Sequence, residues 1–540
     1  MTNNSNSTAY AFDHPHARPP RELADLLGGK GAGLAEMTSV LGLPVPPGFT
    51  LTVDVCREHL RSGWPQSLDS AVRAHCERLE SQVGRKLGDP ADPLLLAVRS
   101  GAPRSMPGML DTVLNLGLND DTVEGLAKVS GNPEFAWDSY RRFLRMFATT
   151  VLGVSDDRLG LCEMTPADPR TDVARLRERI AEMAGRPVPT DPADQLRAAI
   201  EAVFRSWLSP RARAYREREG LPDDLGTAVN VQAMVFGNRD DRSGTGVVFT
   251  RDPATGRDGP YGDYLPGAQG EDVVSGSAHT RPVTALAEQL PDVAAELRRH
   301  LRTLELHYRD LCDVEFTVEA GRLWVLQTRV GKRGAVAAVR TAVALTEDPE
   351  IALTPAEAVA RVPQEIRDKA RAEVLGSADH RDTEVAALTT GLGASPGRVC
   401  GSAVLDVDEA LAADRPVILV RPETSPEDVA GMSVAAGILT GRGGLVSHAA
   451  VVARGWGIPA VVGAEALRFD GASVWVGADG PVIHAGDEIT IDGTTGAVWS
   501  GRIEGNADAP RDDAALLADE LPELGVLEQW ARETEARPPE

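Results

Sequence analysis

A histidine that follows a glycine-rich turn is the strongest candidate for chemistry in the sequence. His448 stands in TGRGGLVSHAAVVARG (440–455), where an apolar strand ends, a turn with two adjacent glycines follows and a helix of small residues begins. The positive end of a helix dipole disfavours a cation, so we expect a neutral imidazole with a lowered pKa. A neutral imidazole is a nucleophile, and backbone amides there can stabilise an anionic group that it carries. The pattern predicts a phosphoryl-accepting histidine, and a structural histidine at a helix start is the alternative.

A second candidate site combines oxygen ligands on two short apolar segments. Asp313 and Glu315 alternate in DVEFTVEAG, and Gln327 and Arg329 alternate in GRLWVLQTRV, which follows directly after a turn at Gly321. Residues two apart on a strand point to the same face, and the glycine turn lets the two strands pair. Mg²⁺ prefers oxygen ligands and shares them with nucleotide phosphates. A solvated strand face with a cross-strand Glu–Arg pair explains the pattern equally well.

Two basic residues stand beside glycine-rich segments that could bind phosphate. Lys30 lies in GGKGAG (28–33), which has neither the Walker A spacing nor the dinucleotide pattern G-x-G-x-x-G. We expect a turn before a helix, with backbone amides and one ammonium near a phosphate, although a plain strand–helix turn fits as well. Arg99 follows an apolar strand and precedes a Gly/Ser/Pro-rich loop. It could bind phosphate oxygens with two hydrogen bonds, or it could be a surface arginine.

The elements that must position these residues change in character along the chain. Residues 120–220 read mostly as amphipathic helices, and β-rich runs begin at Thr227. Residues 335–390 are rich in Ala, Arg and Glu and read as a helical connector. A compact α/β unit begins at Gly391 and closes in a hairpin around Asp492-Gly493, and an acidic segment with a final helix follows.

Composition limits the class of protein. The 540 residues suggest three or four domains, and the formal net charge of −24 disfavours nucleic acid as the main partner. Five scattered cysteines without a C-x-x-C pair argue against a disulfide framework, so a reducing cytoplasm is the expected location. No secretory signal and no apolar stretch of membrane-spanning length are found in the sequence, so no membrane is expected as a partner.

Many segments, in order, resemble the pyruvate, phosphate dikinase family of phosphoenolpyruvate-utilising enzymes. The resemblance covers about Leu23 to Arg502 and rests on a dense set of segments: GGKGAGLAEM, GLPVPPGFT, RSGAPRSMPGMLDTVLNLGL, DSYRRF, VNVQAMVFGN, SGTGVVFTRDPATG, AQGEDVVSG, VEFTVEAGRLWVLQTR, ASPG, ETSPEDV and GGLVSHAAVVARG. The stretch RSGAPRSMPGM separates it from the water-dependent sister enzymes.

The resemblance implies an α/β and α+β multidomain protein. An ATP-grasp nucleotide-binding domain is expected at 1–335, with a helical subdomain at about 120–220. A helical connector at 336–390, a swivelling β/α/β phosphohistidine domain at 391–505 and an acidic helical tail at 506–540 would follow it.

It also implies roles for particular residues. His448 would be the nucleophile, Lys30 and Arg99 would hold the ATP phosphates, and Glu271 in AQGEDVV would lie in the nucleotide site. The remaining implied residues belong to the metal site: Asp313, Glu315 and Gln327 as Mg²⁺ ligands, with Arg329 close to the phosphates. ATP would give its β,γ-pyrophosphoryl unit to the histidine, and inorganic phosphate would then remove the outer phosphate, leaving phosphohistidine, AMP and pyrophosphate.

Three departures from the family pattern affect the function that we expect of this chain. Family members continue into a pyruvate-binding (β/α)₈ barrel with an acid cysteine, whereas this sequence ends at Glu540 and has no cysteine after Cys400. Val446 replaces a threonine that a regulatory kinase targets, and GSAHTRP (276–282) differs from GxRTP.

We therefore expect a phosphohistidine-forming half of a dikinase. Pyruvate or another acceptor would be bound by a separate barrel protein. A phosphotransferase acting on another small molecule and an inactive ATP-binding regulatory homologue remain alternatives, and a homodimer is an open possibility for the assembly.

Overall fold

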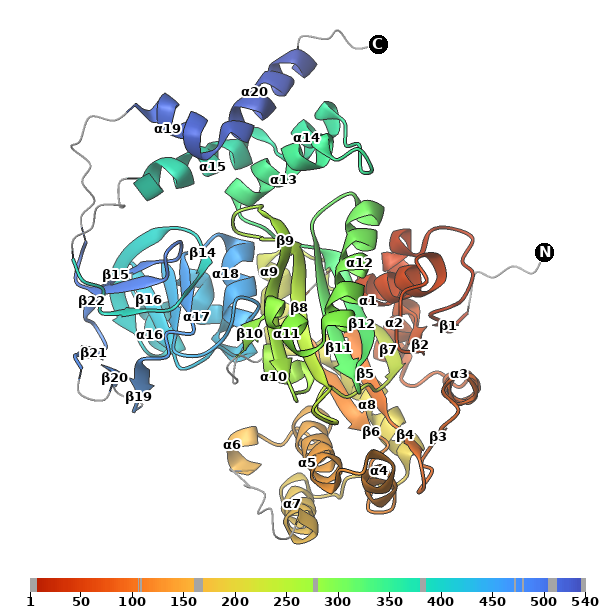
Figure 1. The fold of residues 1–540 in the computed structure, drawn as a ribbon. Helices are drawn as coiled ribbons and strands as arrows, with labels where there is room; N and C mark the ends of the chain where they lie inside the picture. Colours follow the sequence, from red (N-terminus) through yellow and green to blue (C-terminus); the bar gives the residue numbers. More distant parts are fainter. Residues whose placement is uncertain are drawn as a thin grey trace. The chain divides into compact units, whose positions relative to one another are not determined.

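The computed structural model describes residues 7–104, 106, 109–159, 169–274, 280–378, 385–470, 473–477, 480–503 and 512–535. Contacts divide the chain into two compact units, one made of Met1–Ser243 with Thr317–Thr328 and the other of Gly244–Phe316 with Arg329–Glu540. Figure 1 shows the elements of both units. The domain boundaries expected from the sequence stay predictions.

The first unit contains an antiparallel five-stranded sheet in the order β1-β2-β7-β5-β6. Its strands are β1 (Ala9–Ala11), β2 (Gly48–Leu51), β5 (Leu96–Gly101), β6 (Thr112–Leu116) and β7 (Ala228–Ala233). β7 reads AVNVQA, so its valines and its polar residues point to opposite faces. Val229 and Val231 join a large apolar core, while Asn230 faces the side of the sheet on which a glycine-rich helix packs.

Helices build the rest of this unit, as expected for residues 120–220. They are α4 (Thr122–Ser130), α5 (Pro133–Thr150), α6 (Asp156–Leu159), α7 (Pro169–Ala184), α8 (Pro192–Ser206) and α9 (Pro210–Arg218). Asn132 caps α5 by accepting a hydrogen bond from the Phe135 backbone N–H at 3.1 Å, and Pro133 occupies the first helical position. The unit also contains α2 (Val53–Ser62), α3 (Leu68–Val83), β3 (Lys86–Leu87) and β4 (Pro93–Leu94).

The glycine run at 28–33 forms the expected turn before a helix only at its first residue. Gly28, with φ of +68° and ψ of 161°, is a non-helical kink inside α1 (Ala24–Ala35), and it separates a short helical segment from the helix that carries Lys30. A Cβ atom at Gly28 would collide with the backbone oxygen of Gly101, and one at Gly31 would lie 2.7 Å from Thr50 Oγ1. The glycines therefore let α1 approach β5 and β2 closely, which local sequence does not reveal.

A second five-stranded sheet has the order β10-β9-β8-β11-β12. Its strands are β8 (Gly244–Arg251), β9 (Asp258–Pro266), β10 (Arg281–Pro282), β11 (Cys312–Glu319) and β12 (Arg322–Val330). Gly321, with φ of +82°, makes the turn between β11 and β12, as the sequence predicts. The associated helices are α10 (Gly270–Val274), α11 (Leu286–Gln289) and α12 (Pro291–Tyr308).

The C-terminal α/β region of the second unit contains an eight-stranded sheet in the order β13-β23-β22-β15-β16-β17-β18-β14. Its parallel centre is β15 (Arg398–Val404), β16 (Val417–Arg421), β17 (Gly437–Thr440) and β18 (Ala460–Val462), which alternate with α16 (Val407–Ala412), α17 (Val429–Val434) and α18 (His448–Trp456). The other strands are β13 (Thr389–Thr390), β14 (Leu392–Ser395), β22 (Glu488–Asp492) and β23 (Ala497–Ser500). The predicted hairpin is present, but its loop spans four residues, 493–496. A small sheet of β19 (Leu467–Phe469), β20 (Ser473–Val476) and β21 (Val482–His484) covers an apolar cluster.

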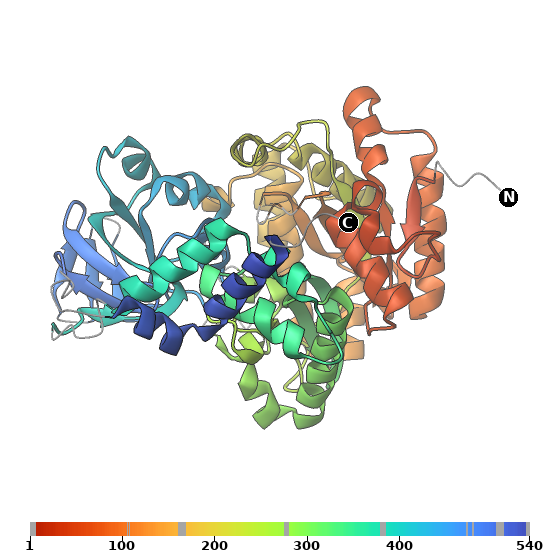
Figure 2. The same ribbon diagram turned by 90° about the horizontal axis from the view of Figure 1, so that it is seen from above.

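The predicted connector and the predicted tail share one apolar core. The connector forms α13 (Ala335–Glu347), α14 (Pro355–Arg361) and α15 (Gln364–Ala378), and the tail forms α19 (Asp513–Glu520) and α20 (Pro522–Glu535). Leu521, Leu524 and Leu527 are buried against Val339 and its neighbours. Figures 1 and 2 show the dark blue C-terminal helices beside the teal connector helices from both directions. The tail is thus a packed part of a helical bundle.

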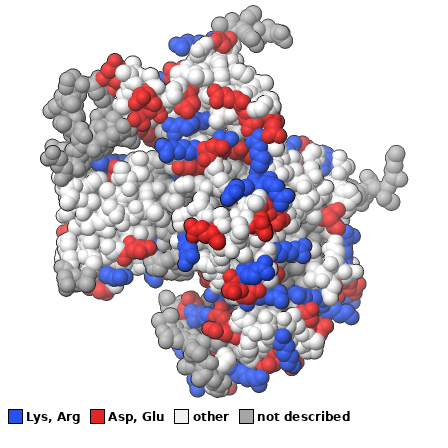
Figure 3. Space-filling view, viewed as in Figure 1, with Lys and Arg blue, Asp and Glu red and all other residues white. Residues whose placement is uncertain are grey.

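The surface carries charges of both signs. On the face drawn in Figure 3, Lys and Arg side chains are interspersed with Asp and Glu side chains. Among the helices that the structure describes, none is both long enough and apolar enough to cross a membrane.

Candidate active site

His448 is the first residue of α18, as the sequence predicts. β17 ends at Thr440, a loop with Gly443 at φ of +107° reverses the chain, and Ser447 in extended geometry precedes the helix. The Val451 backbone N–H donates to the Ser447 carbonyl at 3.0 Å and starts the helical hydrogen-bond series. The backbone N–H groups of this first turn therefore lie beside the imidazole.

The two nitrogens of the His448 ring have different surroundings. Nδ1 lies 3.1 Å from Thr424 Oγ1, in the loop after β16. Nε2 is buried and has no hydrogen-bond partner among the described residues, and the same holds for the neighbouring Ser447 Oγ. Burial lowers the pKa of His448, while the carboxylates of Asp428 and Glu427 act in the opposite direction. The expected lowered pKa is confirmed, but burial is its main cause.

A buried carboxylate anchors the loop before His448. Asp263, on β9, accepts a hydrogen bond from the Val446 backbone N–H at 3.0 Å. A Cβ atom at Gly444 would collide with the same carboxylate, so this position needs glycine. Val446 is buried beside Val247 and Phe249, an environment that suits an apolar side chain.

Arg454 fixes the same loop from α18. Its guanidinium is buried and donates to the Leu445 carbonyl at 2.6 Å and to the Ala394 carbonyl at 3.1 Å. Arg454, Asp263 and Thr424 were not among the candidates from the sequence. Thr424 belongs to the quoted segment ETSPEDV, which was a usable signal, whereas Asp263 is more than 180 residues from the loop it holds and has no local signal.

Lys30 and Arg99 lie on one face of the first sheet. Arg99 and Gly101 are two apart on β5 and share a face, and a Cβ atom at Gly101 would lie 3.4 Å from the Lys30 Cβ. Both side chains are half-buried. Asn230 on β7 pairs in register with Arg99, and its Oδ1 accepts a hydrogen bond from Thr50 Oγ1 at 2.8 Å. Lys30 and Arg99, which the sequence predicts to hold phosphate, therefore lie on the same side of this sheet, and their phosphate-binding role stays a prediction.

Asp313 forms the centre of the candidate metal site. It is 3% exposed on β11, and its Oδ2 accepts a hydrogen bond from Arg329 Nε at 2.7 Å. Burial raises the pKa of Asp313, Arg329 opposes that shift and Glu315 adds to it. The Asp313–Arg329 contact puts both residues on one face of their strands, and alternation gives Glu315 and Gln327 that face too.

The donor atoms present fit Mg²⁺. Asp313 Oδ1 and Gln327 Oε1 are buried oxygens without a hydrogen-bond partner among the described residues. Within the same described part of the chain, no cluster of three or more His, Cys, Asp or Glu side chains could hold a metal alone. A few protein oxygens completed by nucleotide phosphates are the usual arrangement for Mg²⁺. Glu271 lies in the first turn of α10, and its nucleotide-binding role stays a prediction.

Comparisons with known proteins agree with the arrangement of the chain. Residues 24–64 and 60–290 match the pyruvate phosphate dikinase AMP/ATP-binding domain, and residues 413–496 match the PEP-utilising enzyme mobile domain. The chain is 45% identical to the pyruvate, phosphate dikinase of Rhizobium meliloti over 97% of its own length and 60% of the relative's. It is 44% identical to that of Clostridium symbiosum over 92% of its length and 58% of the relative's.

A plant relative is similar to the chain to the same degree. The chain is 44% identical to the chloroplastic pyruvate, phosphate dikinase 1 of Oryza sativa subsp. japonica over 89% of its own length and 52% of the relative's. The chain thus spans at most 60% of the length of these curated relatives. With an ATP-grasp-like nucleotide-binding domain followed by a mobile phosphohistidine domain, it belongs to the pyruvate, phosphate dikinase family of PEP-utilising enzymes.

Proposed function

We propose that this chain phosphorylates its own His448 from ATP and inorganic phosphate. The observation that carries the proposal is the pair of buried polar atoms without partners, His448 Nε2 and Ser447 Oγ, at a helix start. Buried polar atoms usually have hydrogen-bond partners, so these two suit a group that arrives during the reaction. A proton on Nδ1, donated to Thr424 Oγ1, leaves the lone pair on Nε2, which makes Nε2 the nucleophile.

Several of the residues predicted from the sequence would hold the nucleotide. Lys30 and Arg99 would neutralise ATP phosphate oxygens, Glu271 would line the nucleotide site, and Arg329 would lie near the phosphates. Asp313, Glu315 and Gln327 would hold Mg²⁺. Bound Mg²⁺ offsets the negative charge that develops on the transferring phosphoryl oxygens.

The reaction would take place in two steps. Nε2 attacks the β-phosphorus of ATP, the bond to the α-phosphate oxygen breaks, and AMP leaves. Inorganic phosphate then attacks the γ-phosphorus on the histidine, so pyrophosphate leaves and the β-phosphate remains on Nε2. Backbone N–H groups at the start of α18 would stabilise the phosphoryl oxygens throughout.

Phosphoryl transfer to an acceptor would use residues outside the two matched domains. We propose that pyruvate or another acceptor is bound at a site outside these two domains, and that the phosphohistidine domain carries the group to it. The connector helices α13 to α15 join this domain to the nucleotide-binding part and would permit such a movement.

The position of a radiolabel tests the proposal. The protein would be incubated with Mg²⁺, phosphate and ATP labelled at either the β- or the γ-phosphate. We expect an acid-labile protein adduct that retains the β-label only, with the γ-label in pyrophosphate. His448→Ala should abolish the adduct, and His484→Ala, which removes an exposed histidine of β21, should not.

Other label patterns would point elsewhere. Retention of the γ-label would indicate direct transfer of the terminal phosphate, as in another class of phosphotransferase. Nucleotide binding without any adduct would favour an ATP-binding regulatory homologue.

A further inference from the structure

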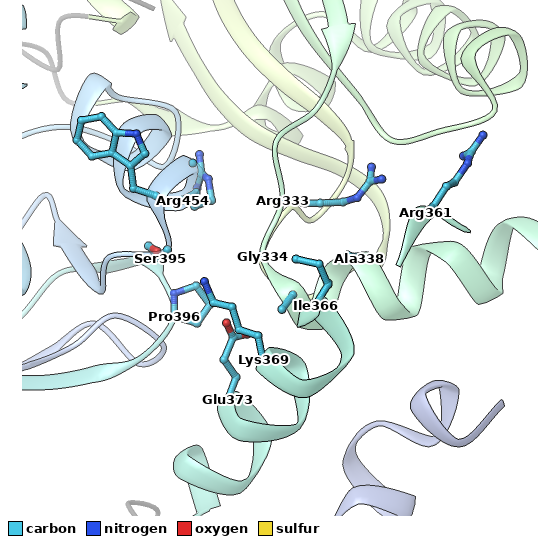
Figure 4. A pocket seen from close by; sticks show the side chains of 14 residues that line it. Arg333, Gly334, Ala338, Arg361, Ile366, Lys369, Glu373, Ser395, Pro396 and Arg454 are labelled. Atoms are coloured by element: carbon cyan, nitrogen blue, oxygen red, sulfur yellow. The ribbon is translucent and has the colours of Figure 1, made fainter. Parts of the chain in front are cut away.

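A cavity of about 310 Å³ lies away from His448, at the other end of α18. Its wall combines the end of α18, the turn after β14, the segment after β12 and the connector helices α13 and α15. Figure 4 shows side chains from these segments around one space, with Arg333 and Arg361 on one side, Lys369 below and Arg454 opposite. The volume is at the small end of the range for small-molecule sites.

Cations outnumber carboxylates on this wall. Arg333, Arg361, Lys369 and Arg454 line the cavity, and Glu373 is the one acidic side chain among its lining residues. Asp310 pairs with Arg333 and Arg361 from behind the wall but does not line the cavity, so the lining itself has four cations and one carboxylate. The lining therefore favours an anion.

The arginines are held in place by contacts behind the wall. Arg333 pairs with Asp310 at 2.5 and 3.1 Å, and Arg361 donates to the Arg309 carbonyl and lies 3.5 Å from the same aspartate. Arg454 is buried and donates to backbone carbonyls, which do not cancel its charge. These contacts orient the guanidinium groups before any ligand arrives, which lowers the entropic cost of binding.

Lys369 is the exposed member of the set. It is exposed on α15, one turn before Glu373, and its ammonium lies against Gly457, the left-handed cap of α18. A cation near the carboxyl end of a helix is electrostatically favourable. Lys369 therefore links the connector helix α15 to α18, the helix that begins with His448.

Apolar residues form the remainder of the wall. Ile366, Ala338, Pro396 and Trp456 line the cavity beside the cations. A wall in which apolar residues lie among cations suits a small carbon skeleton that carries one strongly anionic group.

We propose that this cavity binds the phosphate group of a small phosphorylated metabolite, a phosphate monoester. A phosphate monoester carries close to two negative charges at neutral pH, which offsets the excess of cations. Arginine guanidinium groups bind phosphate oxygens through paired hydrogen bonds, and lysine adds a point charge. The ligand would bridge the connector and the carboxyl end of α18. This inference concerns a site separate from His448 and does not depend on the proposed function.

Two measurements on the full chain without nucleotide test the proposal. Isothermal titration would use glycerol 3-phosphate, inorganic phosphate and uncharged glycerol as probes. We expect saturable binding of the phosphate ester and none of glycerol, and binding of inorganic phosphate would show that the free ion is also a ligand. Amide hydrogen exchange should show ligand-dependent protection in 364–378 and 453–457.

Substitution of the exposed lysine identifies the site. Lys369→Met should weaken binding about tenfold, because a charge-assisted hydrogen bond is lost, and Lys369→Arg should retain most of the affinity. Lys86→Met removes a lysine that is exposed in the first unit and serves as the control. Absence of binding, unchanged affinity in Lys369→Met, or protection confined to other segments would overturn the proposal.

Discussion

Thr424 is the partner of one nitrogen of the His448 ring. Its buried hydroxyl lies 3.1 Å from Nδ1, so Nδ1 is occupied, while Nε2 has no partner among the described residues. The contact orients the ring, and when Nδ1–H donates to the hydroxyl, as the proposed reaction requires, the lone pair lies on Nε2. Thr424 is thus a positioning residue in the proposed reaction.

Replacing Thr424 by valine keeps the shape and removes the hydroxyl. We expect Thr424→Val to slow adduct formation at least about tenfold, since the buried Nδ1 loses its partner and the tautomer is no longer fixed. The rate constant of β-label incorporation at saturating ATP measures this. Thr424→Ser, which restores the hydroxyl, should recover most of the rate. An unchanged rate in Thr424→Val would show that this hydrogen bond does not matter for the reaction.

The half-buried imidazole of His448 makes the free energy of unfolding depend on pH. The folded-state pKa of His448 is lowered, so the unfolded chain binds a proton that the folded chain does not as the pH falls below about 6.5. His448 therefore contributes its full stability above that pH and loses it below. The midpoint of thermal unfolding should fall more steeply from pH 7.5 to 5.5 in the unaltered protein than in His448→Gln. If the unfolding midpoint depends on pH in the same way in both proteins, the pKa of His448 is not lowered in the folded state.

Gly28 combines close packing of α1 on its sheet with backbone strain. Gly28 and Gly42 both have positive φ, at +68° and +61°, but ψ of 161° puts Gly28 in a region that is essentially restricted to glycine, and a Cβ atom there meets the Gly101 oxygen, whereas one at Gly42 meets open space. Gly42→Ala should cost about 1–2 kcal/mol, the penalty of a positive φ alone. Gly28→Ala should cost at least about 3 kcal/mol, because the backbone is strained and α1 or β5 must also move. Thermal unfolding of both variants gives the comparison, and equal costs would mean that α1 can shift freely.

The same helix shows where prediction from the sequence succeeds and fails. Alternation and helical periodicity predict β7, β12, α5 and α18 because these patterns are local. The break at Gly28 was predictable from the glycines, whereas the close approach of the following helix to β2, to β5 and to β7, about 200 residues later, was not. His448 was predictable from its turn and helix, whereas Asp263 was not. The apolar spacing of Leu521, Leu524 and Leu527 predicts a helix face in need of a partner, but not that the connector supplies it.

Taken together, the contacts of the second unit hold His448 in a closed position. Nε2 has no exposed surface there, although a phosphohistidine must reach an acceptor to be useful. The loop before His448 is fastened by Asp263 on β9 and by Arg454, and burial raises the pKa of Asp263 against the effect of its hydrogen bonds. Burying a carboxylate whose pKa is raised costs free energy, and exposing it to water recovers part of that cost. The Asp263 contact can therefore release its loop at little net cost in free energy. Opening of this loop would therefore accompany the domain movement that the proposed reaction requires.

Removal of the anchor should expose the ring. We expect His448 to react more rapidly with diethyl pyrocarbonate in Asp263→Ala than in the unaltered protein, because the Val446 backbone N–H loses its acceptor and the loop opens more often. Mass spectrometry of the modified peptides measures the rate for each histidine. His484, exposed on β21 with Nδ1 3.2 Å from Ser473 Oγ, is an internal control whose rate should be the same in both proteins. If His448 already reacts as rapidly as His484 in the unaltered protein, Nε2 is not shielded and the anchor has no gating role.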